Sequence, residues 1–236
     1  MNVYIIGCGG VGSYLAPLIA KLLITRTDDK MVLVDGDSFE KKNLDRQLFA
    51  ESQIGVNKAN ALAQLIHGND KRVTIEVHEQ YFSYGFPGVT SEDFLICCAD
   101  NHPTRREVLE TVDDKECRAV ICGNGTTDAD AYYYAMDMQG AAADPRIMFP
   151  EIATGKANDP RITSCQGEAQ EQTPQLAMAN FMAAGLAQQL FYYHALSGKP
   201  ELVPREMHPV YFASSLYGFQ SRTPKQAQEL MEAANA

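Results

Sequence analysis

The stretch NVYIIGCGGVGSYLAPLIA at residues 2–20 decides the fold. Its first five residues form a short apolar run typical of a buried strand, and a helical pattern starts at Val11. Between them, Gly7, Gly9, Gly10 and Gly12 carry the pattern G-x-G-x-x-G. Glycines let the backbone approach a phosphate, and the helix start offers free N–H groups and a positive dipole end. The stretch therefore predicts a nucleotide site, with a tight turn for close helix packing as the alternative.

Strand and helix patterns alternate through the next hundred residues. The predicted strands cover residues 2–6, 31–35, 73–82, 93–98 and 118–123. The predicted helices cover residues 11–24, 56–67 with Gly68 as terminator, and 103–115, where Pro103 stands in the first turn. Such alternation favours an α/β fold with a Rossmann-like, doubly wound, mostly parallel sheet.

The second half of the chain changes character. AYYYAMDM (131–138) resembles a strand of an antiparallel arm, and residues 139–174, with four prolines and little periodicity, predict a long mobile loop. A long helix over 175–196, a late strand over 210–217 and a helix capped by Thr223 complete residues 175–236. We expect a single domain over 1–236, with residues 1–124 as the nucleotide-binding core.

Charge is distributed unevenly along the chain. Its net charge is −10, yet residues 1–75 hold nine basic and eight acidic side chains. An acidic chain is a poor general binder of nucleic acid or of membrane surfaces, because phosphates attract the opposite charge. The near-neutral first third is therefore the better place for a polyanionic ligand.

Six cysteines occur, and none forms a C-x-x-C pair, so we expect neither a structural zinc site nor a redox pair. The N-terminus shows no basic segment and no apolar segment of the kind found in secretory signals. The most apolar run, 176–193, contains Asn180, Gln188 and Gln189, which suits a buried helix better than a membrane span. A cytoplasmic protein with reduced thiols is expected.

Several charged residues follow the predicted strands. Asp35 ends the second strand, where a carboxylate can accept hydrogen bonds from a ribose. Arg46 and Lys58 offer fixed cations that a triphosphate needs for attack at its α-phosphorus, and that a dinucleotide enzyme does not. Asp100 ends the fourth strand and can hold Mg²⁺. Taken singly, Arg46 and Lys58 could be solvated surface residues, and Asp100 could cap the following helix.

Together these segments resemble a family. GCGGVGS (7–13), DGDSFEKKNLDRQLF (35–49), GVNKA (55–59) and ADNHPTRR (99–106), in this order and spacing, look like the ThiF/MoeB/HesA family, the adenylating domain of ubiquitin-activating-type enzymes. The resemblance is strong over residues 3–124 and weaker through the helix at 175–196. It implies adenylation, with ATP and Mg²⁺, of the C-terminal carboxylate of a ubiquitin-like or sulfur-carrier protein ending in Gly-Gly. It also implies a homodimer.

The resemblance assigns roles to individual residues. It implies a phosphate loop at Gly7, Gly9, Gly10 and Gly12, with Asp35 on the ribose and Asp37 beside it. It implies that Asn43, Arg46 and Lys58 grip the triphosphate, that Asp100 binds the metal, and that Arg105 supports the site. Arg46 and Lys58 are the predicted catalytic cations. Cys165 stands where several relatives keep a cysteine that attacks the acyl adenylate; the alternative is an incidental loop cysteine.

Three departures from the family pattern stand out. Zinc-binding C-x-x-C pairs and a separate cysteine domain are missing, and the first arginine is Arg26. Many dimeric members lend an arginine from an N-terminal helix to the partner's ATP site, so either another arginine acts here or catalysis is weaker or absent. An NAD(P)-dependent oxidoreductase and a catalytically silent scaffold that binds a ubiquitin-like partner therefore remain alternative functions.

Overall fold

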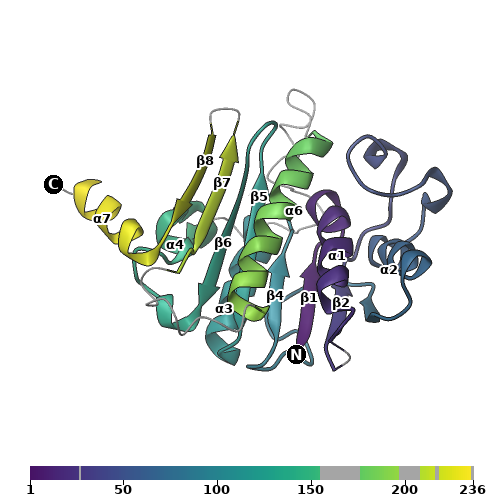
Figure 1. The fold of residues 1–236 in the computed structure, drawn as a ribbon, viewed down its shortest axis with the longest axis horizontal. Coiled ribbons are helices and arrows are strands. Elements are labelled where there is room, and N and C mark those ends of the chain that lie inside the picture. The colour runs from purple at the N-terminus through teal and green to yellow at the C-terminus, as the bar shows by residue number, and fades with distance from the viewer. Residues whose placement is uncertain (27, 155–175, 197–207, 216–217, 235–236) are drawn as a thin grey trace.

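A computed structural model describes residues 1–26, 28–154, 176–196, 208–215 and 218–234. Within these ranges a mixed sheet forms the centre, with helices on both faces (Figure 1). The strands are β1 (Asn2–Ile6), β2 (Lys30–Val34), β3 (Thr74–His78), β4 (Phe94–Cys97), β5 (Arg118–Asn124), β6 (Ala129–Ala135), β7 (Tyr211–Ser215) and β8 (Gly218–Arg222). The longer helices are α1 (Gly10–Leu23), α2 (Lys58–Asn69), α3 (His102–Lys115), α6 (Ala177–Phe191) and α7 (Pro224–Ala234).

Short helical segments occur between these elements. They are η1 (Lys41–Asn43), η2 (Glu51–Gln53), η3 (Met136–Met138), α4 (Pro145–Met148), α5 (Pro150–Thr154) and the π-helical segment η4 (Tyr192–Leu196). None of the helices in the described ranges combines the length and the hydrophobicity that crossing a membrane requires.

The strand order is β3-β2-β1-β4-β5-β6-β7-β8. Strands β1 to β5 pair in parallel, whereas β5–β6, β6–β7 and β7–β8 pair antiparallel. The order reverses between β1 and β4, and a doubly wound sheet opens a ligand crevice at the carboxyl ends of its strands at such a point. The structure thus confirms the predicted Rossmann-like sheet with its late antiparallel extension.

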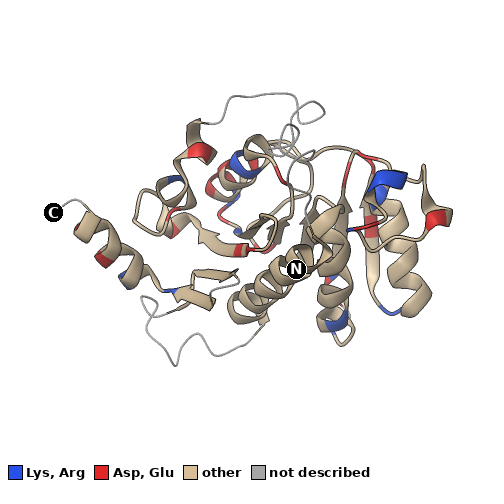
Figure 2. Ribbon diagram, turned by 90° about the horizontal axis from the view of Figure 1, so that it is seen from above, with Lys and Arg blue, Asp and Glu red and all other residues tan. Residues whose placement is uncertain are grey.

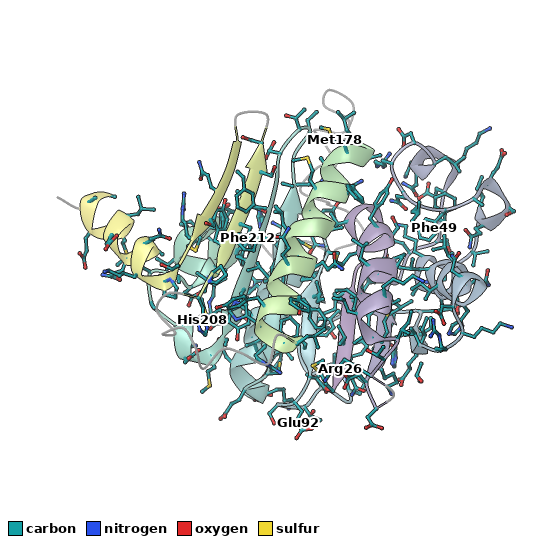
Figure 3. All side chains as sticks on the ribbon, viewed as in Figure 1. Arg26, Phe49, Glu92, Met178, His208 and Phe212 are labelled. Atoms are coloured by element: carbon teal, nitrogen blue, oxygen red, sulfur yellow. The ribbon has the colours of Figure 1, made fainter. Side chains whose placement is uncertain are left out.

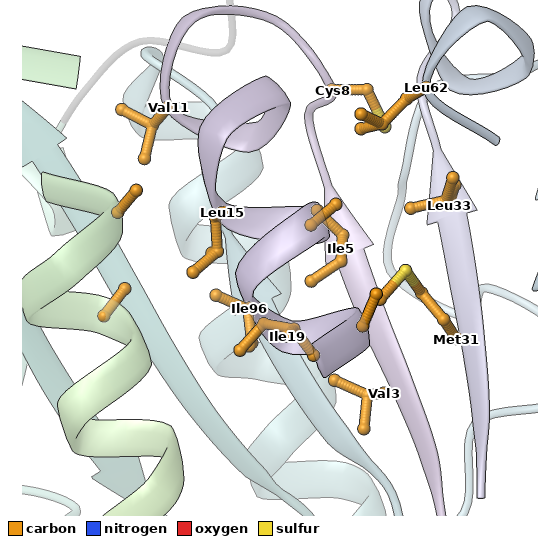
Figure 4. Close-up of a cluster of buried hydrophobic side chains, with 14 of the residues drawn as sticks. Val3, Ile5, Cys8, Val11, Leu15, Ile19, Met31, Leu33, Leu62 and Ile96 are labelled. Atoms are coloured by element: carbon orange, nitrogen blue, oxygen red, sulfur yellow. The ribbon is translucent and has the colours of Figure 1, made fainter. Parts of the chain in front are cut away.

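Each central strand serves two cores, because successive side chains point to opposite faces. Val3 and Ile5 of β1 pack with α1, α2 and α6 (Figure 4), whereas Tyr4 and Ile6 pack on the α3 side. Helix α6 lies alongside α1 (Figure 1). Its close approach rests on small side chains that are fully buried, namely Ala179, Ala183, Ala184 and Ala187.

Two local predictions were wrong. Gly68 does not terminate a helix: α2 runs through it to Asn69, and Asp70 leaves the helical conformation. In the predicted loop over 139–174, residues 145–154 form α4 and α5. Pro145 stands at the start of α4, where its missing N–H costs nothing, and Asp144 caps that helix through the N–H of Arg146. Residues 155–174, including Cys165, lie outside the described residues.

The end of the chain also differs in part. Strand β8 was not predicted, because GFQSR (218–222) holds a single large apolar residue and no clear alternation. The final helix does start after Thr223, whose hydroxyl accepts a hydrogen bond from the N–H of Gln226 at 3.3 Å.

Candidate nucleotide-binding site

The glycine loop joins β1 to α1 in a conformation that requires glycine at two positions. Gly7 has φ +88°, and a Cβ built on Gly12 would lie 2.0 Å from the carbonyl oxygen of Gly7. Gly9 is the N-cap of α1 and has no side chain to occupy the first N–H groups of the helix. These groups, with the positive end of the helix dipole, are available to an anion.

Asp35 directly follows β2 and holds the glycine loop by hydrogen bonding. Its Oδ2 accepts a hydrogen bond from the N–H of Cys8 at 2.7 Å, and its Oδ1 accepts one from the N–H of Asp37 at 2.8 Å. Burial raises the pKa of Asp35, although the nearby Lys58 ammonium opposes the rise. Each carboxylate oxygen keeps a further lone pair, so Asp35 can still accept a ribose hydroxyl.

Both predicted cations are largely buried rather than solvated. Lys58 begins α2 with its side chain 12% exposed, and its Nζ lies 2.9 Å from Oδ2 of Asp37. Burial would lower the pKa of Lys58, but the charges of Asp35 and Asp37 raise it. The Arg46 side chain is 15% exposed, and its Nη1 donates to the carbonyl of Lys42 at 2.8 Å. Fixed and partly desolvated cations of this kind suit phosphate oxygens.

The structure excludes the helix-capping role considered for Asp100. Asn101, not Asp100, is the N-cap of α3 and accepts a hydrogen bond from the N–H of Thr104 at 2.9 Å. Burial raises the pKa of Asp100, with Arg105 and Lys58 opposing the rise. In the described ranges no cluster of three His, Cys, Asp or Glu side chains could hold a metal by itself. One carboxylate completed by substrate phosphates is nevertheless an ordinary Mg²⁺ site, so Asp100 fits the ion.

These residues line a cleft of about 420 Å³ at the carboxyl edge of the parallel strands, here called the nucleotide cleft. The predicted site residues that line it are Gly7, Gly9, Gly10, Asp35, Asp37, Asn43, Arg46, Lys58 and Asp100. Gly12 packs against the carbonyl of Gly7 and does not line the cleft. Arg105 lines a neighbouring pocket, and Cys165 is not among the described residues. Viewed from above, charged segments of both signs surround this edge (Figure 2).

Other cleft residues were not predicted from the sequence. Asn180 of α6 is fully buried and donates through Nδ2 to the carbonyl of Arg46 at 3.0 Å. The Oδ1 of Asn180 and the Oε1 of Gln47 are buried and have no hydrogen-bond partner within the described part of the chain. Two unpaired acceptors that line one cleft fit a ligand that donates hydrogen bonds. The only sequence signal for Asn180 is that it interrupts an apolar helix.

Arg26, the first arginine of the sequence, lies away from the nucleotide cleft of its own chain. It pairs with Asp29 after α1, at the edge opposite the nucleotide cleft (Figure 3).

Over residues 1–230 the sequence matches the profile of the ThiF family. The chain belongs to the ThiF family. The match spans both the parallel core and the antiparallel extension, so it includes the glycine loop and the nucleotide cleft.

Curated relatives of this ThiF-family chain are considerably longer. The ubiquitin-like modifier-activating enzyme 5 of Oryza sativa subsp. japonica is 27% identical over 128 residues, which cover 48% of this chain and 30% of the relative. Two solved structures share the fold across 94% of the chain. E. coli MccB with ATP has a TM-score of 0.64 and 17% sequence identity, and 63% of its own chain is covered. PaaA has a TM-score of 0.63 and 21% sequence identity, and 62% of its own chain is covered. MccB has also been solved with AMPCPP and MccA.

Proposed function

We propose that this chain binds ATP with Mg²⁺ and adenylates the C-terminal carboxylate of a polypeptide, releasing pyrophosphate. The observation that carries the proposal is the convergence of Arg46 and Lys58 on a helix start without a side-chain cap, beside Asp100. The names of the relatives support it, since they are ubiquitin-like modifier-activating enzymes, and MccB has been solved with ATP.

The chain's own residues supply most of the chemistry in this proposal. Mg²⁺ bound at Asp100 would neutralise charge on the phosphates. Asp35 accepts the ribose hydroxyl, with Asp37 and Asn43 beside it, and the glycine loop holds the phosphates on the N–H groups of α1. Arg46 and Lys58 then offset the negative charge that builds on the β- and γ-phosphates as the substrate carboxylate attacks the α-phosphorus.

Pyrophosphate exchange into ATP, driven by the polypeptide substrate, tests the proposal. We expect Arg46→Ala to reduce exchange by about 10²–10³-fold, the usual cost of removing one preorganised donor in a transition state. Lys41→Ala is the matched control, because Lys41 is an exposed cation of the same segment that does not line the cleft. Thermal stabilisation by NAD but not by ATP with Mg²⁺ would instead support the oxidoreductase.

The substrate we propose is a ubiquitin-like or sulfur-carrier protein with a C-terminal Gly-Gly, bound by a homodimer of this chain. Co-purification followed by mass spectrometry identifies the partner, and light scattering gives the oligomeric state. A partner that binds but drives no exchange contradicts adenylation and supports the silent scaffold.

Transfer of the acyl group to Cys165 is part of the same proposal. After adenylation, the Cys165 thiolate attacks the acyl carbon, a C–S bond forms, and AMP leaves. Trapping with the partner and ATP should give a thiol-sensitive adduct, and its persistence in Cys165→Ser contradicts this step.

A further inference from the structure

A second pocket, of about 290 Å³, opens beside the nucleotide cleft and shares Asp100 and Asn124 with it. We call it the acidic pocket. It lies where β5 ends and the antiparallel strand β6 begins, so its walls come from the turn between these strands and from α5. Apart from Asp100, the described lining residues of this pocket have no part in the adenylation steps proposed above.

Carboxylates outnumber cations in the described lining of the acidic pocket. Asp128, Asp130 and Glu151 join Asp100 there, and Arg105 is the one basic side chain among them. Arg105 is held in place by the carbonyls of Ala99 and Cys122, at 3.2 and 3.4 Å. With Asp100 assigned to Mg²⁺, three carboxylates still face a single guanidinium.

The lack of a side chain at Gly123 lets the Asp130 carboxylate and the Arg105 guanidinium approach each other. A Cβ built on it would lie 2.8 Å from Oδ1 of Asp130 and 3.1 Å from Nη2 of Arg105. Both groups therefore converge over the same bare backbone position. Arg105 is accordingly placed to balance Asp130, which leaves Asp128 and Glu151 as the excess negative charge of the described lining.

An aromatic wall completes the pocket and contains an unsatisfied polar atom. Tyr132 and Phe149 stack with ring centroids 5.2 Å apart, and both line the pocket. Tyr132 is only 3% exposed, and its hydroxyl has no hydrogen-bond partner in the described part of the chain. A buried hydroxyl normally finds a partner, so this oxygen points to a ligand that completes its hydrogen bonding.

Carboxylates beside stacked aromatic rings select one class of ligand. An ammonium or guanidinium group can donate hydrogen bonds to carboxylates and to a tyrosine oxygen, and it is attracted to aromatic faces. An anion would be repelled by the excess carboxylates, and a neutral apolar group would leave their charges unpaired. The donor set is not one for a lone metal ion either, since no described cluster of three ligating side chains exists.

We propose that the acidic pocket binds an organic cation, an alkylammonium or guanidinium group, next to the carboxylate that the nucleotide cleft activates. This placement rests on the adenylation proposed above, because only then does an activated acyl group lie beside the pocket. The cation comes either from a basic side chain of the polypeptide substrate or from a separate amine that accepts the acyl group. In the second case the ammonium first gives one proton to a pocket carboxylate, which frees the nitrogen lone pair. The amine then forms a C–N bond with the acyl carbon, the C–O bond to AMP breaks, and the second proton passes to another carboxylate of the pocket.

Calorimetric titration of the full chain with n-butylammonium tests the binding itself, and it needs no nucleotide. We expect saturable binding that n-butanol, of the same length but neutral, does not show. Asp128→Asn should weaken it roughly tenfold, the loss expected for one charge-assisted hydrogen bond. Tyr132→Phe, which keeps the ring and removes the hydroxyl, should weaken it by a smaller factor.

Glu92→Gln is the control, because Glu92 is exposed at the opposite edge of the sheet (Figure 3) and should leave binding unchanged. Equal binding of butanol, or unchanged binding by an Asp128→Asn variant with normal circular dichroism, overturns the proposal. Butylammonium binding without pyrophosphate exchange would leave the pocket standing and remove adenylation. Pyrophosphate exchange without butylammonium binding would support adenylation and overturn the cation-binding role of the pocket.

The source of the cation follows from the same probe. With ATP, Mg²⁺ and the polypeptide that drives exchange, a butylamide of that polypeptide identifies an acceptor amine. Competition between butylammonium and the polypeptide, without amide, identifies a basic side chain of the substrate. If neither an amide nor competition is observed, the placement of the pocket beside the activated acyl group is overturned.

Discussion

The nucleotide cleft and the acidic pocket share Asp100 and Asn124, yet opposite kinds of strand pairing build them. The nucleotide cleft collects the carboxyl ends of parallel strands, together with the start of α1. The acidic pocket collects the end of β5 and the beginning of β6, which runs back antiparallel. One sheet edge therefore presents two different surfaces, according to the direction of the neighbouring strand.

This difference decides which charged and backbone groups each region presents at the edge. Parallel strands bring helix starts to the edge, and a helix start favours anions, which Arg46 and Lys58 reinforce. At the antiparallel junction no helix follows β5 directly; the turn brings Asp128 to the edge instead, and the start of β6 brings Asp130. An anionic ligand thus belongs to the first region and a cationic one to the second.

The largest expected effect, which should separate the two regions completely, follows from Gly12→Ala. Its new methyl group would overlap the carbonyl of Gly7, so the glycine loop must move. We expect ATP binding to weaken by more than about 100-fold and the free energy of unfolding to fall by about 3 kcal/mol, at the upper end of overpacking costs. Calorimetry and urea unfolding measure both quantities. Butylammonium binding should persist.

Gly68→Ala provides the matched control for Gly12→Ala. A Cβ at Gly68 meets no atom within 4 Å, and the residue lies inside α2 without a positive φ. Alanine should therefore stabilise the protein by about 0.5–1 kcal/mol and leave ATP binding as it is. Equal loss of ATP binding in both variants would contradict the role given to the glycine loop.

The parallel half of the fold was predictable because its signals are local. A strand, the glycines and a helix follow one another within residues 2–24. Each later family segment up to residue 106 likewise follows a predicted strand or begins a predicted helix. The missed features depend on distant partners. Asn180 reaches Arg46 across 134 positions of sequence, and such a contact leaves no periodic trace.

Asp128 and Asp130 were not predicted as site residues for a different reason. The rule that ligand residues follow the carboxyl ends of strands holds for parallel strands, whereas these two stand before and at the start of an antiparallel one. Likewise, prolines at 145 and 150 pointed to a loop, but each begins a short helix, where proline is equally at home. The described site residues implied by the family, apart from Gly12 and Arg105, line the nucleotide cleft, because the local order of strand and helix brings them to that edge.

A moderate effect, confined to one region, is expected from Asn180→Ala. Removing its amide leaves the part-buried carbonyl of Arg46 without the donor that holds it, so the Arg46 segment is less fixed. We expect ATP to bind about tenfold more weakly, the usual cost of one buried hydrogen bond and its unpaired partner. Gln188→Ala, on the same helix but outside the cleft, should bind ATP normally. An equal loss of butylammonium binding would show that the two regions are not separate.

The smallest effect distinguishes the two regions by the pH dependence of stability. Burial would raise the pKa of Asp37, but the hydrogen bond from Tyr81 and the Lys58 charge lower it below the ordinary value. Its contribution to stability is therefore present above the unfolded pKa of about 4 and is lost as pH falls through the folded pKa. In Asp130, burial raises the pKa, Asp128 adds to the rise and Arg105 opposes it. Its contribution is present below the unfolded pKa and is lost as pH rises through the folded pKa.

Urea unfolding of Asp37→Asn and Asp130→Asn at several pH values between about 3 and 6 measures this contrast. The stability of the wild type relative to Asp37→Asn should grow as pH rises, because an ionised Asp37 is paired with Lys58. The stability of the wild type relative to Asp130→Asn should shrink over the same range, because ionising Asp130 in its buried setting works against folding. Slopes of the same sign would contradict the opposite electrostatic character of the two regions. If butylammonium reverses the Asp130 slope, the cation lies close enough to that carboxylate to favour its charged form.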